Sequence, residues 1–374
     1  MKVYQCIHKY GPHIPQFEQR HGIDDRTELT FKELRRLVIE DGYAASYVLL
    51  PAMEDPDGSV FYTIWNYERL QRLWAREHGW KAKDLAAIRR AQIEEFQPDV
   101  VYNMSAYYDR SFAVTLPRPR STTKVVCWNA IIEERPTALQ GYDCHFSLHA
   151  PYVKEWNSQG IRACELQPGI PRTWVESSRN AERPIDVLFY GQYTEAMFTA
   201  RNRLVDELAR IRDETELNVE LAVQFGFRWR TYFKVPGLPR LTVRRLIFPD
   251  EWIRKRTSHP RYGSDLYRLI TQSKIVVNAC TDHNRDYKSN MRLFEGIGHG
   301  ALLLAEAGAY PPGFEAGRDF VPYKSIESLR GLLQGVLSDW PQKRQVAESA
   351  QERIASIYSK ENQWATFVRC IASL

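Results

Sequence analysis

The chain lacks the long apolar segments that would tie it to a membrane. No apolar run approaches the roughly 20 residues that a membrane-spanning helix needs. The first residues, Met1-Lys2-Val3-Tyr4-Gln5-Cys6, lack the apolar stretch of a signal peptide and are typical of an opening strand. The sequence therefore predicts a cytoplasmic protein rather than a secreted or membrane-spanning one.

Cysteine is scarce, and no metal-ligand pattern is present. The six cysteines are scattered through 374 residues without a C-x-x-C pair, which favours reduced thiols and argues against a zinc site. Asp55-Pro56-Asp57 matches a D-x-D metal motif, but Asp and Pro are expected in such a turn for conformational reasons. We therefore expect no metal and no other cofactor.

Positive charge is concentrated in one segment, although the net charge is only +5. Between Arg228 and Arg261, ten cations are opposed only by Asp250 and Glu251, and aromatic residues are interleaved with them. Such a segment can meet a membrane surface, a nucleic acid or an anionic glycan. Nucleic acid is the least favoured, because no binding module accompanies the charge. The plain alternative is a solvated excursion whose aromatic residues pack on their own domain.

Strand-like and helix-like segments alternate along the whole chain, which is typical of doubly wound α/β domains. A length of 374 residues exceeds one ordinary core and indicates two domains. We expect a loop over Lys9–Asp25 and a strand over Ala45–Leu50. The turn at 167–171 and the polar stretch 175–183 mark the boundary. The predicted domains are therefore residues 1–174 and 184–360, followed by a C-terminal helix over 361–374.

The segment from Ser289 to Glu306 is the most informative part of the sequence. It predicts a helix opened by Ser289 or Asn290, whose side chains can cap free backbone N–H groups. The helix ends at a glycine, and Ala301–Ala305 follows as a buried strand. A helix start is a ready site for a phosphate, so this order suits a nucleotide diphosphate.

The residues N-M-R-L-F-E-G-x-G-x-G-A-L-L-L, which begin at Asn290, resemble the nucleotide-binding segment of the CgeB-like bacterial glycosyltransferases. The likeness is strongest over 262–323 and looser from 184 onward. It implies the α/β GT-B fold, in which two Rossmann-like domains face each other across a cleft and the final helix crosses back to the N-terminal domain. In the related E-x7-E enzymes two glutamates face the donor. Glu295 stands at the second of these positions, and Tyr287 replaces the first.

The resemblance assigns donor-binding roles around this segment. Glu295 would accept both ribose hydroxyls, and its apolar flanks indicate that it is buried rather than solvated. Ser289 and Asn290 would bind the diphosphate at the helix start. Arg292 can pair with Glu295 or reach the diphosphate, and Lys288 can add a phosphate contact or be merely solvated.

Three further donor contacts lie elsewhere in the sequence. Gly191 directly follows the apolar strand over 186–190, where a glycine lets the backbone approach a phosphate or simply ends the strand. By resemblance, Arg201 on the next helix faces the donor and the loop Tyr262-Gly263 lies beside the nucleobase.

The first domain should bind the acceptor, since ligands of open α/β sheets sit beyond the carboxyl ends of the strands. His8, His13 and His149 follow such strand ends and are the candidates for the catalytic base that takes the acceptor's proton. Each of them can equally be a structural histidine.

Together these features predict a metal-independent glycosyltransferase. It would move a sugar from a nucleotide-sugar to a hydroxyl of a glycan or lipid-linked acceptor, in bacterial surface polysaccharide synthesis. We also expect peripheral contact with the inner membrane face through residues 228–261. We expect no nucleic acid partner. A non-hydrolysing epimerase of the same fold and a non-catalytic nucleotide- or glycan-binding protein remain as alternatives. The sequence leaves open the sugar, the base, the acceptor, the stereochemical outcome and the oligomeric state.

Overall fold

The computed structural model describes residues 1–81, 84–129, 139–194, 198–226, 228–234, 242–247, 249–280 and 286–374, with the backbone alone for 228–234 and 242–247. The chain divides into two compact units. Unit 1 comprises Met1–Arg172, Tyr262–Asp265 and Ala355–Leu374, and unit 2 comprises Thr173–Arg261 and Leu266–Ile354.

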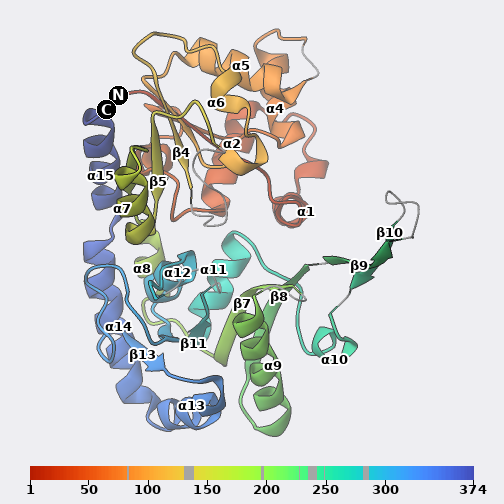
Figure 1. Cartoon of the computed structure of the whole chain (residues 1–374), viewed down its shortest axis with the longest axis vertical. Helices are drawn as coiled ribbons and strands as arrows, with labels where there is room; N and C mark the ends of the chain where they lie inside the picture. The colour runs from red at the N-terminus through yellow and green to blue at the C-terminus, as the bar shows by residue number, and fades with distance from the viewer. Residues whose placement is uncertain are drawn as a thin grey trace. The chain divides into compact units, whose positions relative to one another are not determined.

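Unit 1 is built on a parallel sheet with the strand order β2-β1-β3-β4-β5-β6 (Figure 1). Its strands are β1 (Val3–Ile7), β2 (Val60–Ile64), β3 (Val100–Asn103), β4 (Lys124–Trp128), β5 (Cys144–Ser147) and β6 (Ala163–Glu165). Its helices are α1 (His13–Arg20), η1 (Ile23–Asp25), α2 (Phe31–Asp41), α3 (Leu50–Glu54), α4 (Glu68–Glu77), α5 (Leu85–Phe96), η2 (Ala106–Tyr108), α6 (Phe112–Thr115), α7 (Ala150–Ser158) and α15 (Lys360–Ala372).

Local sequence explains the regular parts of unit 1. The strands β1, β2 and β3 are buried along their whole length, as in parallel sheets with both faces covered by helices. Helix α2 begins with a capping box: the Thr30 side chain accepts a hydrogen bond from the Glu33 backbone, and the Glu33 carboxylate accepts one from the Thr30 backbone. It ends at Gly42 in the left-handed conformation.

Two sequence expectations about unit 1 are wrong. The predicted loop over Lys9–Asp25 contains the helix α1, because Ile14 and Phe17 share a buried helix face and Pro15 is tolerated in the first turn. The predicted strand over Ala45–Leu50 is absent. The Gln5 side chain donates to the Tyr47 carbonyl at 2.9 Å and accepts from the Leu49 backbone N–H at 3.0 Å. This amide therefore takes the place of a neighbouring strand, and the second strand of the sheet is β2.

Unit 2 has a second parallel sheet, in the order β13-β12-β11-β7-β8, and a separate antiparallel pair, β9 and β10. Its strands are β7 (Ile185–Thr194), β8 (Val219–Gly226), β9 (Arg228–Lys234), β10 (Thr242–Ile247), β11 (Ser273–Asn278), β12 (Leu302–Glu306) and β13 (Phe320–Tyr323). Its helices are α8 (Arg172–Ser178), α9 (Thr199–Glu214), α10 (Glu251–Arg254), α11 (Ser264–Thr271), α12 (Met291–Gly298), η5 (Ile326–Ser328), α13 (Leu329–Ser338) and α14 (Trp340–Ile357), of which α8 and α11 begin within the segments of unit 1.

The core of unit 2 lies between its sheet and the helices α9 and α13. Phe189 of β7 and Val277 of β11 belong to one buried cluster with Leu208 of α9 and Leu333 of α13. Burying such side chains stabilises a fold by about 1.5–3 kcal/mol each. Among the helices of the described chain, none is long and apolar enough to cross a membrane.

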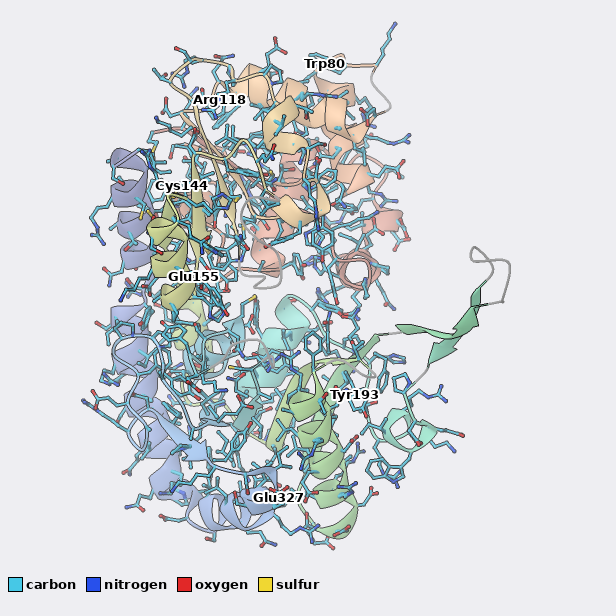
Figure 2. The ribbon with its side chains drawn as sticks, in the orientation of Figure 1. Trp80, Arg118, Cys144, Glu155, Tyr193 and Glu327 are labelled. Atoms are coloured by element: carbon cyan, nitrogen blue, oxygen red, sulfur yellow. The ribbon has the colours of Figure 1, made fainter. Side chains whose placement is uncertain are left out.

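The strand β7 continues beyond Gly191, so the expectation that this glycine ends the strand is wrong. Gly191 pairs with Val223 of β8, and the ladder runs on to Thr194. Tyr193 lies in this extension (Figure 2) and is buried. Gly191 adopts φ +154°, a conformation that side chains rarely allow.

Candidate functional site

Polar side chains gather at the carboxyl ends of β7 and β11 in unit 2. Asn278 is the last residue of β11, and its Oδ1 accepts a hydrogen bond from Asn290 Nδ2 at 2.9 Å. Asn290 stands at the N-cap position of α12, but its side chain makes no capping hydrogen bond, so of the two residues expected to cap this helix Asn290 does not. Asn278 Nδ2 and Asn290 Oδ1 are buried and have no hydrogen-bond partner among the described residues. The start of α12 thus presents polar atoms that this part of the chain does not satisfy.

Arg292 joins this group from the first turn of α12. Its Nη1 donates to Asn278 Oδ1 at 3.1 Å and to the Ala279 carbonyl at 2.8 Å. No ion pair within 4.0 Å joins it to Glu295 in the described chain, so the predicted pairing of these two residues is not formed. A Cβ at Gly191 would lie 3.0 Å from Arg292 Nη2. The glycine therefore leaves room for the guanidinium.

Glu295 is buried in the interior of α12, as its apolar flanks predict, with only 3% of its surface exposed. The Tyr190 hydroxyl, at the end of the predicted strand before Gly191, donates to Glu295 Oε2 at 2.8 Å. Burial raises the pKa of Glu295, against the opposing effects of the Tyr190 hydrogen bond and the Arg292 charge. The carboxylate is thus held by Tyr190 within reach of the Arg292 charge, and its ribose role stays a prediction.

Sequence reasoning missed two members of this site, Tyr190 and Asn278. Each is a polar residue that ends an apolar run, Val187–Tyr190 in β7 and Ile275–Asn278 in β11. Because ligands of parallel sheets lie at the carboxyl ends of strands, that position was the available signal.

Other predicted donor residues of unit 2 have separate surroundings. Lys288 forms an ion pair with Glu306 at the end of β12, with Nζ 3.3 Å from Oε2. Ser289 is buried. Arg201 lies on α9 with only 6% of its surface exposed, and its guanidinium stacks over the Phe198 ring at 4.7 Å. The structure therefore brings Asn290, Arg292, Gly191 and Glu295 together and gives Lys288 and Arg201 partners of their own.

Tyr262 and Gly263 belong to unit 1, where they pack against residues of α1 and α2. The Tyr262 ring meets the His13 ring edge-on at 6.3 Å. Gly263 adopts φ +59°, and a Cβ there would lie 2.0 Å from Asp41 Oδ2. Their predicted place beside a nucleobase stays a prediction.

The segment Tyr262–Asp265 is anchored by Asp41, the last residue of α2, which sequence reasoning also missed. Asp41 accepts hydrogen bonds from Arg20 Nε at 2.9 Å and from the Ser264 hydroxyl at 3.3 Å. Arg20 in turn donates to Asp265 at 2.5 Å. Burial alone would raise the pKa of Asp41, but the His13 hydrogen bond and the Arg20 charge outweigh it and lower that pKa.

His8 lies directly after β1 and is partly exposed. Its Nδ1 is 2.9 Å from the Ser105 hydroxyl, and its ring stacks on Tyr108 at 3.6 Å. Its Nε2 is buried and has no hydrogen-bond partner among the described residues. Burial lowers the pKa of His8 to about 4, so the imidazole is neutral at pH 7 and can accept a proton.

The other two histidine candidates are buried. His13 Nε2 lies 3.1 Å from Asp41 Oδ2, and the His13 ring stacks on Tyr43 at 4.2 Å. His149 precedes α7, and burial lowers its pKa to about 4. Of the three candidates, only His8 is accessible to solvent in this structure.

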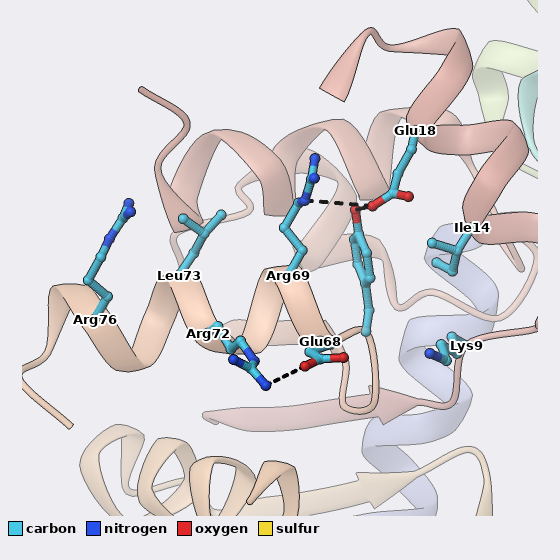
Figure 3. Close-up of a pocket in the computed structure, with 9 residues that line it drawn as sticks. Lys9, Ile14, Glu18, Glu68, Arg69, Arg72, Leu73 and Arg76 are labelled. Atoms are coloured by element: carbon cyan, nitrogen blue, oxygen red, sulfur yellow. Dashed lines mark hydrogen bonds and ion pairs between the residues drawn. The ribbon is translucent and has the colours of Figure 1, made fainter. Parts of the chain in front are cut away.

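A cavity of about 540 Å³ lies in unit 1 beside Lys9, which follows β1, and Tyr67, which follows β2 (Figure 3). The residues that line it are Lys9, Ile14, Glu18, Tyr67, Glu68, Arg69, Arg72, Leu73 and Arg76. Four of these are cations and two are acids. Arg69 lies 3.8 Å from Glu18, and Arg72 pairs with Glu68. The lining is therefore net positive and lies at the carboxyl ends of two strands.

The basic segment 228–261 is only partly described. Residues 235–241 and 248 lie outside the described residues, and no side chains are described for β9 and β10. In the described part, Arg256 stacks over the Trp252 ring at 4.5 Å and pairs with Asp213. Ile253 is buried, and Trp252 packs against the core of unit 2. The end of the segment thus packs on its own unit.

Comparisons with known proteins bear on the fold and on this site. Residues 201–369 match a family model described as glycosyl transferase-like. The chain has the GT-B fold. Its two parallel Rossmann-like sheets are those predicted. No curated protein sequence matches the chain.

Several solved glycosyltransferase structures resemble this chain in fold. HepE from Anabaena, in complex with UDP and glucose, has 11% identity and a TM-score of 0.56, over 100% of both chains. A glycosyltransferase from Rickettsia africae has 10% identity and a TM-score of 0.52, over 100% of this chain and 98% of that one. TarM from S. aureus has 9% identity and a TM-score of 0.52, over 77% of this chain. The present chain covers 59% of the length of TarM. At these identities the likeness establishes the fold alone.

Proposed function

We propose that this protein is a nucleotide-sugar-dependent glycosyltransferase of the CgeB-like group, with its donor site in unit 2. The observation that carries the proposal is the group of Asn278, Asn290 and Arg292 at the start of α12, beside the buried pair of Glu295 and Tyr190. The motif that begins at Asn290 supports the closer assignment.

The chemistry of this group suits a nucleoside diphosphate. A helix start with uncapped amides favours an anion, and a guanidinium binds phosphate through two parallel hydrogen bonds. Arg292 now donates to Asn278 and a carbonyl, which are neutral acceptors. Hydrogen bonds to a charged phosphate are about twice as strong, so exchanging partners favours the ligand. The same charges would stabilise the diphosphate as it leaves the sugar.

Glu295 would bind the ribose. Tyr190 uses one of the lone pairs of its carboxylate, and an ionised carboxylate has about four acceptor positions. The remaining positions can accept the vicinal hydroxyls, with Tyr190 fixing the orientation of the group. In this proposal Tyr190 is a positioning residue.

Unit 1 would bind the acceptor, with His8 as the base. The net positive cavity at the ends of β1 and β2 supports an acceptor that carries an anionic group, such as the phosphate of a lipid-linked glycan in surface polysaccharide synthesis. One ion pair that lines it is exposed, since Arg72 and Glu68 are each more than half accessible. Such a pair contributes only about 0–1 kcal/mol, so an anionic ligand can displace Glu68 from Arg72.

We also propose that transfer needs no metal ion. Asp57 of the D-x-D stretch pairs with Lys32 at 2.5 Å and Arg35 at 2.7 Å, so its carboxylate is committed to cations of its own unit. In the described chain no three His, Cys, Asp or Glu residues lie together in a way that could hold a metal. Arg292 and the start of α12 would supply the electrostatic stabilisation instead.

One experiment tests the proposal. The protein is first titrated calorimetrically with UDP and with other nucleoside diphosphates. UDP-sugars are then offered alone, with neutral glycans and with phosphate-bearing lipid-linked glycans. We expect tight binding of a nucleoside diphosphate, and sugar transfer that depends on the anionic acceptor and persists in EDTA. Interconversion of sugars without an acceptor would show an epimerase, and binding without any turnover would show a non-catalytic protein. Loss of transfer in EDTA that magnesium or manganese restores would overturn metal independence.

A further inference from the structure

Tyr108 is the most exposed large hydrophobic side chain in the described part of the chain, with 62% of its surface accessible to solvent. It ends the short helix η2, which follows β3 at the carboxyl edge of the sheet in unit 1. Ligands of parallel sheets bind beyond this edge. A single exposed apolar side chain is ordinary on a protein surface, but the way in which this one is held is not.

The backbone of Tyr108 is fixed on both sides. Its N–H donates to the Ser105 carbonyl at 3.0 Å, and the Ser105 N–H donates to the Asn103 side chain at 2.9 Å, at the end of β3. The next residue, Asp109, forms an ion pair with Arg89, whose side chain is almost completely buried. Tyr108 therefore stands on an anchored backbone although its side chain lies in solvent.

The ring of Tyr108 is fixed as well, by the imidazole of His8. The two rings are stacked, with centroids 3.6 Å apart and an interplanar angle of 24°. Ser105 holds His8 in turn, because its hydroxyl oxygen accepts from the His8 backbone N–H at 2.6 Å and lies 2.9 Å from Nδ1. One face of the Tyr108 ring is thus covered, and its 62% exposure leaves the opposite face open to solvent.

The open face of Tyr108 suits a sugar ring. The faces of an aromatic ring carry partial negative charge. The C–H bonds on one side of a sugar are polarised by neighbouring oxygens, so they meet such a face favourably while the sugar hydroxyls stay in water. A rigid aromatic side chain also loses little conformational entropy when a ligand packs on it. The acceptor proposed above is a glycan and supplies such rings.

We propose that Tyr108 is an acceptor-binding residue whose open face stacks on one sugar of the glycan, next to the sugar that receives the transferred unit. This rests on the proposed function, in which His8 takes the acceptor's proton.

The position of His8 decides which sugar reacts. Carbon atoms in contact are about 3.5–4.0 Å apart, so with His8 3.6 Å behind Tyr108 a sugar on the open face would lie roughly 7 Å from the imidazole. A general base must lie within about 2.6–3.2 Å of the group that it deprotonates. The reacting hydroxyl therefore belongs to a neighbouring sugar, and the acceptor contains at least two sugar units.

The first measurement needs no donor. Methyl glycosides of common hexoses, and disaccharides built from them, are tested against the whole chain by saturation-transfer difference NMR, and the disaccharide with the strongest signal is titrated. We expect Tyr108→Ala to weaken its binding by about two- to tenfold, the size of an aromatic pair. Tyr108→Phe keeps the ring and should retain binding. Val114→Ala is the matched control, because Val114 is 61% exposed on α6 of the same unit.

The second measurement separates stacking on the sugar from support of His8. Transfer from UDP-sugars is compared between this disaccharide and its monosaccharide. We expect the ratio of their kcat/KM values to fall in Tyr108→Ala, because only the disaccharide reaches both the ring and the base. A substitution that merely disturbs His8 would lower kcat for both acceptors alike and leave that ratio unchanged. If the protein transfers no sugar, the proposed function fails, and the binding measurement still decides the role of Tyr108.

Three results would overturn the proposal. They are a panel in which Tyr108→Ala weakens the binding of no glycan, an equal loss of transfer for both acceptors, and a wild-type complex without NMR contacts between the sugar C–H protons and the Tyr108 ring. The last of these needs no variant that binds, so it decides the matter even if Tyr108→Ala fails to fold. Surface substitutions of this kind rarely unfold a protein.

Discussion

At the scale of single residues, Glu295 is both buried and acidic, and these two properties oppose each other. An unpaired carboxylate is strongly disfavoured in a protein interior, so a buried one needs hydrogen bonds or a function. The Tyr190 hydroxyl supplies one hydrogen bond, and Arg292 lies near enough to act by its charge. The apolar flanks of Glu295 predicted its burial. Its partner could not be predicted, because Tyr190 is 105 positions away and is brought there by the pairing of β7 with β11.

We predict that Glu295→Ala strongly weakens nucleotide binding while the protein stays folded. Each hydrogen bond to a charged acceptor contributes about 1.5–3 kcal/mol, so loss of the ribose contacts should weaken affinity at least roughly tenfold. Calorimetric titration with the preferred nucleoside diphosphate measures this. Glu327→Ala is the matched control, since Glu327 lies on the surface with its side chain 70% exposed (Figure 2). Unchanged affinity in a folded Glu295→Ala protein would remove the ribose role.

The raised pKa of Glu295 also predicts a pH-dependent stability. Below its ordinary value of about 4.5 the carboxyl is protonated in both the folded and the unfolded chain. As pH rises past that value the unfolded chain loses its proton first, so the folded state loses stability until its own raised pKa is passed. The slope can reach at most about 1.4 kcal/mol per pH unit.

Glu295→Gln cannot ionise and should escape this loss. We therefore expect the Tm of Glu295→Gln minus that of the wild type to increase with pH, starting from about pH 4.5 and levelling off above the raised pKa. Thermal unfolding of both proteins across this range is the measurement. A difference that is constant or falls with pH would mean that the folded protein ionises Glu295 without penalty.

At the scale of elements, the segment before α11 shows how one buried carboxylate fixes a loop. Asp41 at the end of α2 accepts hydrogen bonds from α1 and from Ser264, and Arg20 of α1 bonds Asp265. The sequence predicted helices near 30–41 and 265–272, but not that Asp41 holds the segment Tyr262–Asp265. A carboxylate that ends a helix is usually solvated, and nothing in its neighbours marks this one as buried.

We predict that Gly263→Ala destabilises the protein by about 1–3 kcal/mol, the usual penalty for a residue forced into an unfavourable backbone region. Its φ is +59°, and the added Cβ would lie 2.0 Å from Asp41 Oδ2 and 2.9 Å from the Asp41 carbonyl. Gly331→Ala is the matched control: this glycine lies inside α13, and no atom lies within 4 Å of its added Cβ. It should stabilise by about 0.5–1 kcal/mol. Equal effects of the two substitutions in urea unfolding would contradict the crowding at Asp41.

Helices and strands could be predicted where local sequence signals agreed. The prediction failed where groups distant in the sequence determine the local structure. Thr30 and Glu33 form the capping box that their spacing favours, and β3 and β4 match their apolar runs. The run Ala45–Leu50 has strand-like composition, but the side chain of Gln5 takes its backbone hydrogen bonds. Beyond Gly191, β7 continues because β8 offers a full ladder as far as Gly226. These outcomes depend on long-range partners that a single sequence does not display.

At the scale of the whole molecule, the charge is distributed unevenly along the chain. The net charge of +5 is mild, yet ten cations fall between Arg228 and Arg261. Two cations at the described end of this segment form ion pairs within unit 2: Arg256 pairs with Asp213, and Lys255 pairs with Glu251. Arg254, in contrast, is exposed. We therefore expect an anionic acceptor or membrane surface to meet exposed cations such as Arg254.

We predict that the wild-type protein binds anionic vesicles and that binding weakens as salt rises. Exposed charges are screened over a Debye length of roughly 8 Å at physiological ionic strength, and each basic residue near an anionic surface contributes about 1 kcal/mol. Replacing Arg244, Arg245 and Arg254 together by alanine should therefore lower the vesicle partition coefficient by roughly two orders of magnitude. Co-sedimentation with phosphatidylglycerol-containing vesicles, and with neutral vesicles as the reference, measures the effect. Arg318→Ala is the matched control, because Arg318 is an exposed cation in a loop of the same unit, and its one ion pair among the described residues is with its neighbour Glu315. If wild type and triple variant partition equally, and the triple variant still glycosylates a lipid-linked acceptor at the wild-type rate, the segment is a solvated surface whose aromatic residues serve their own unit.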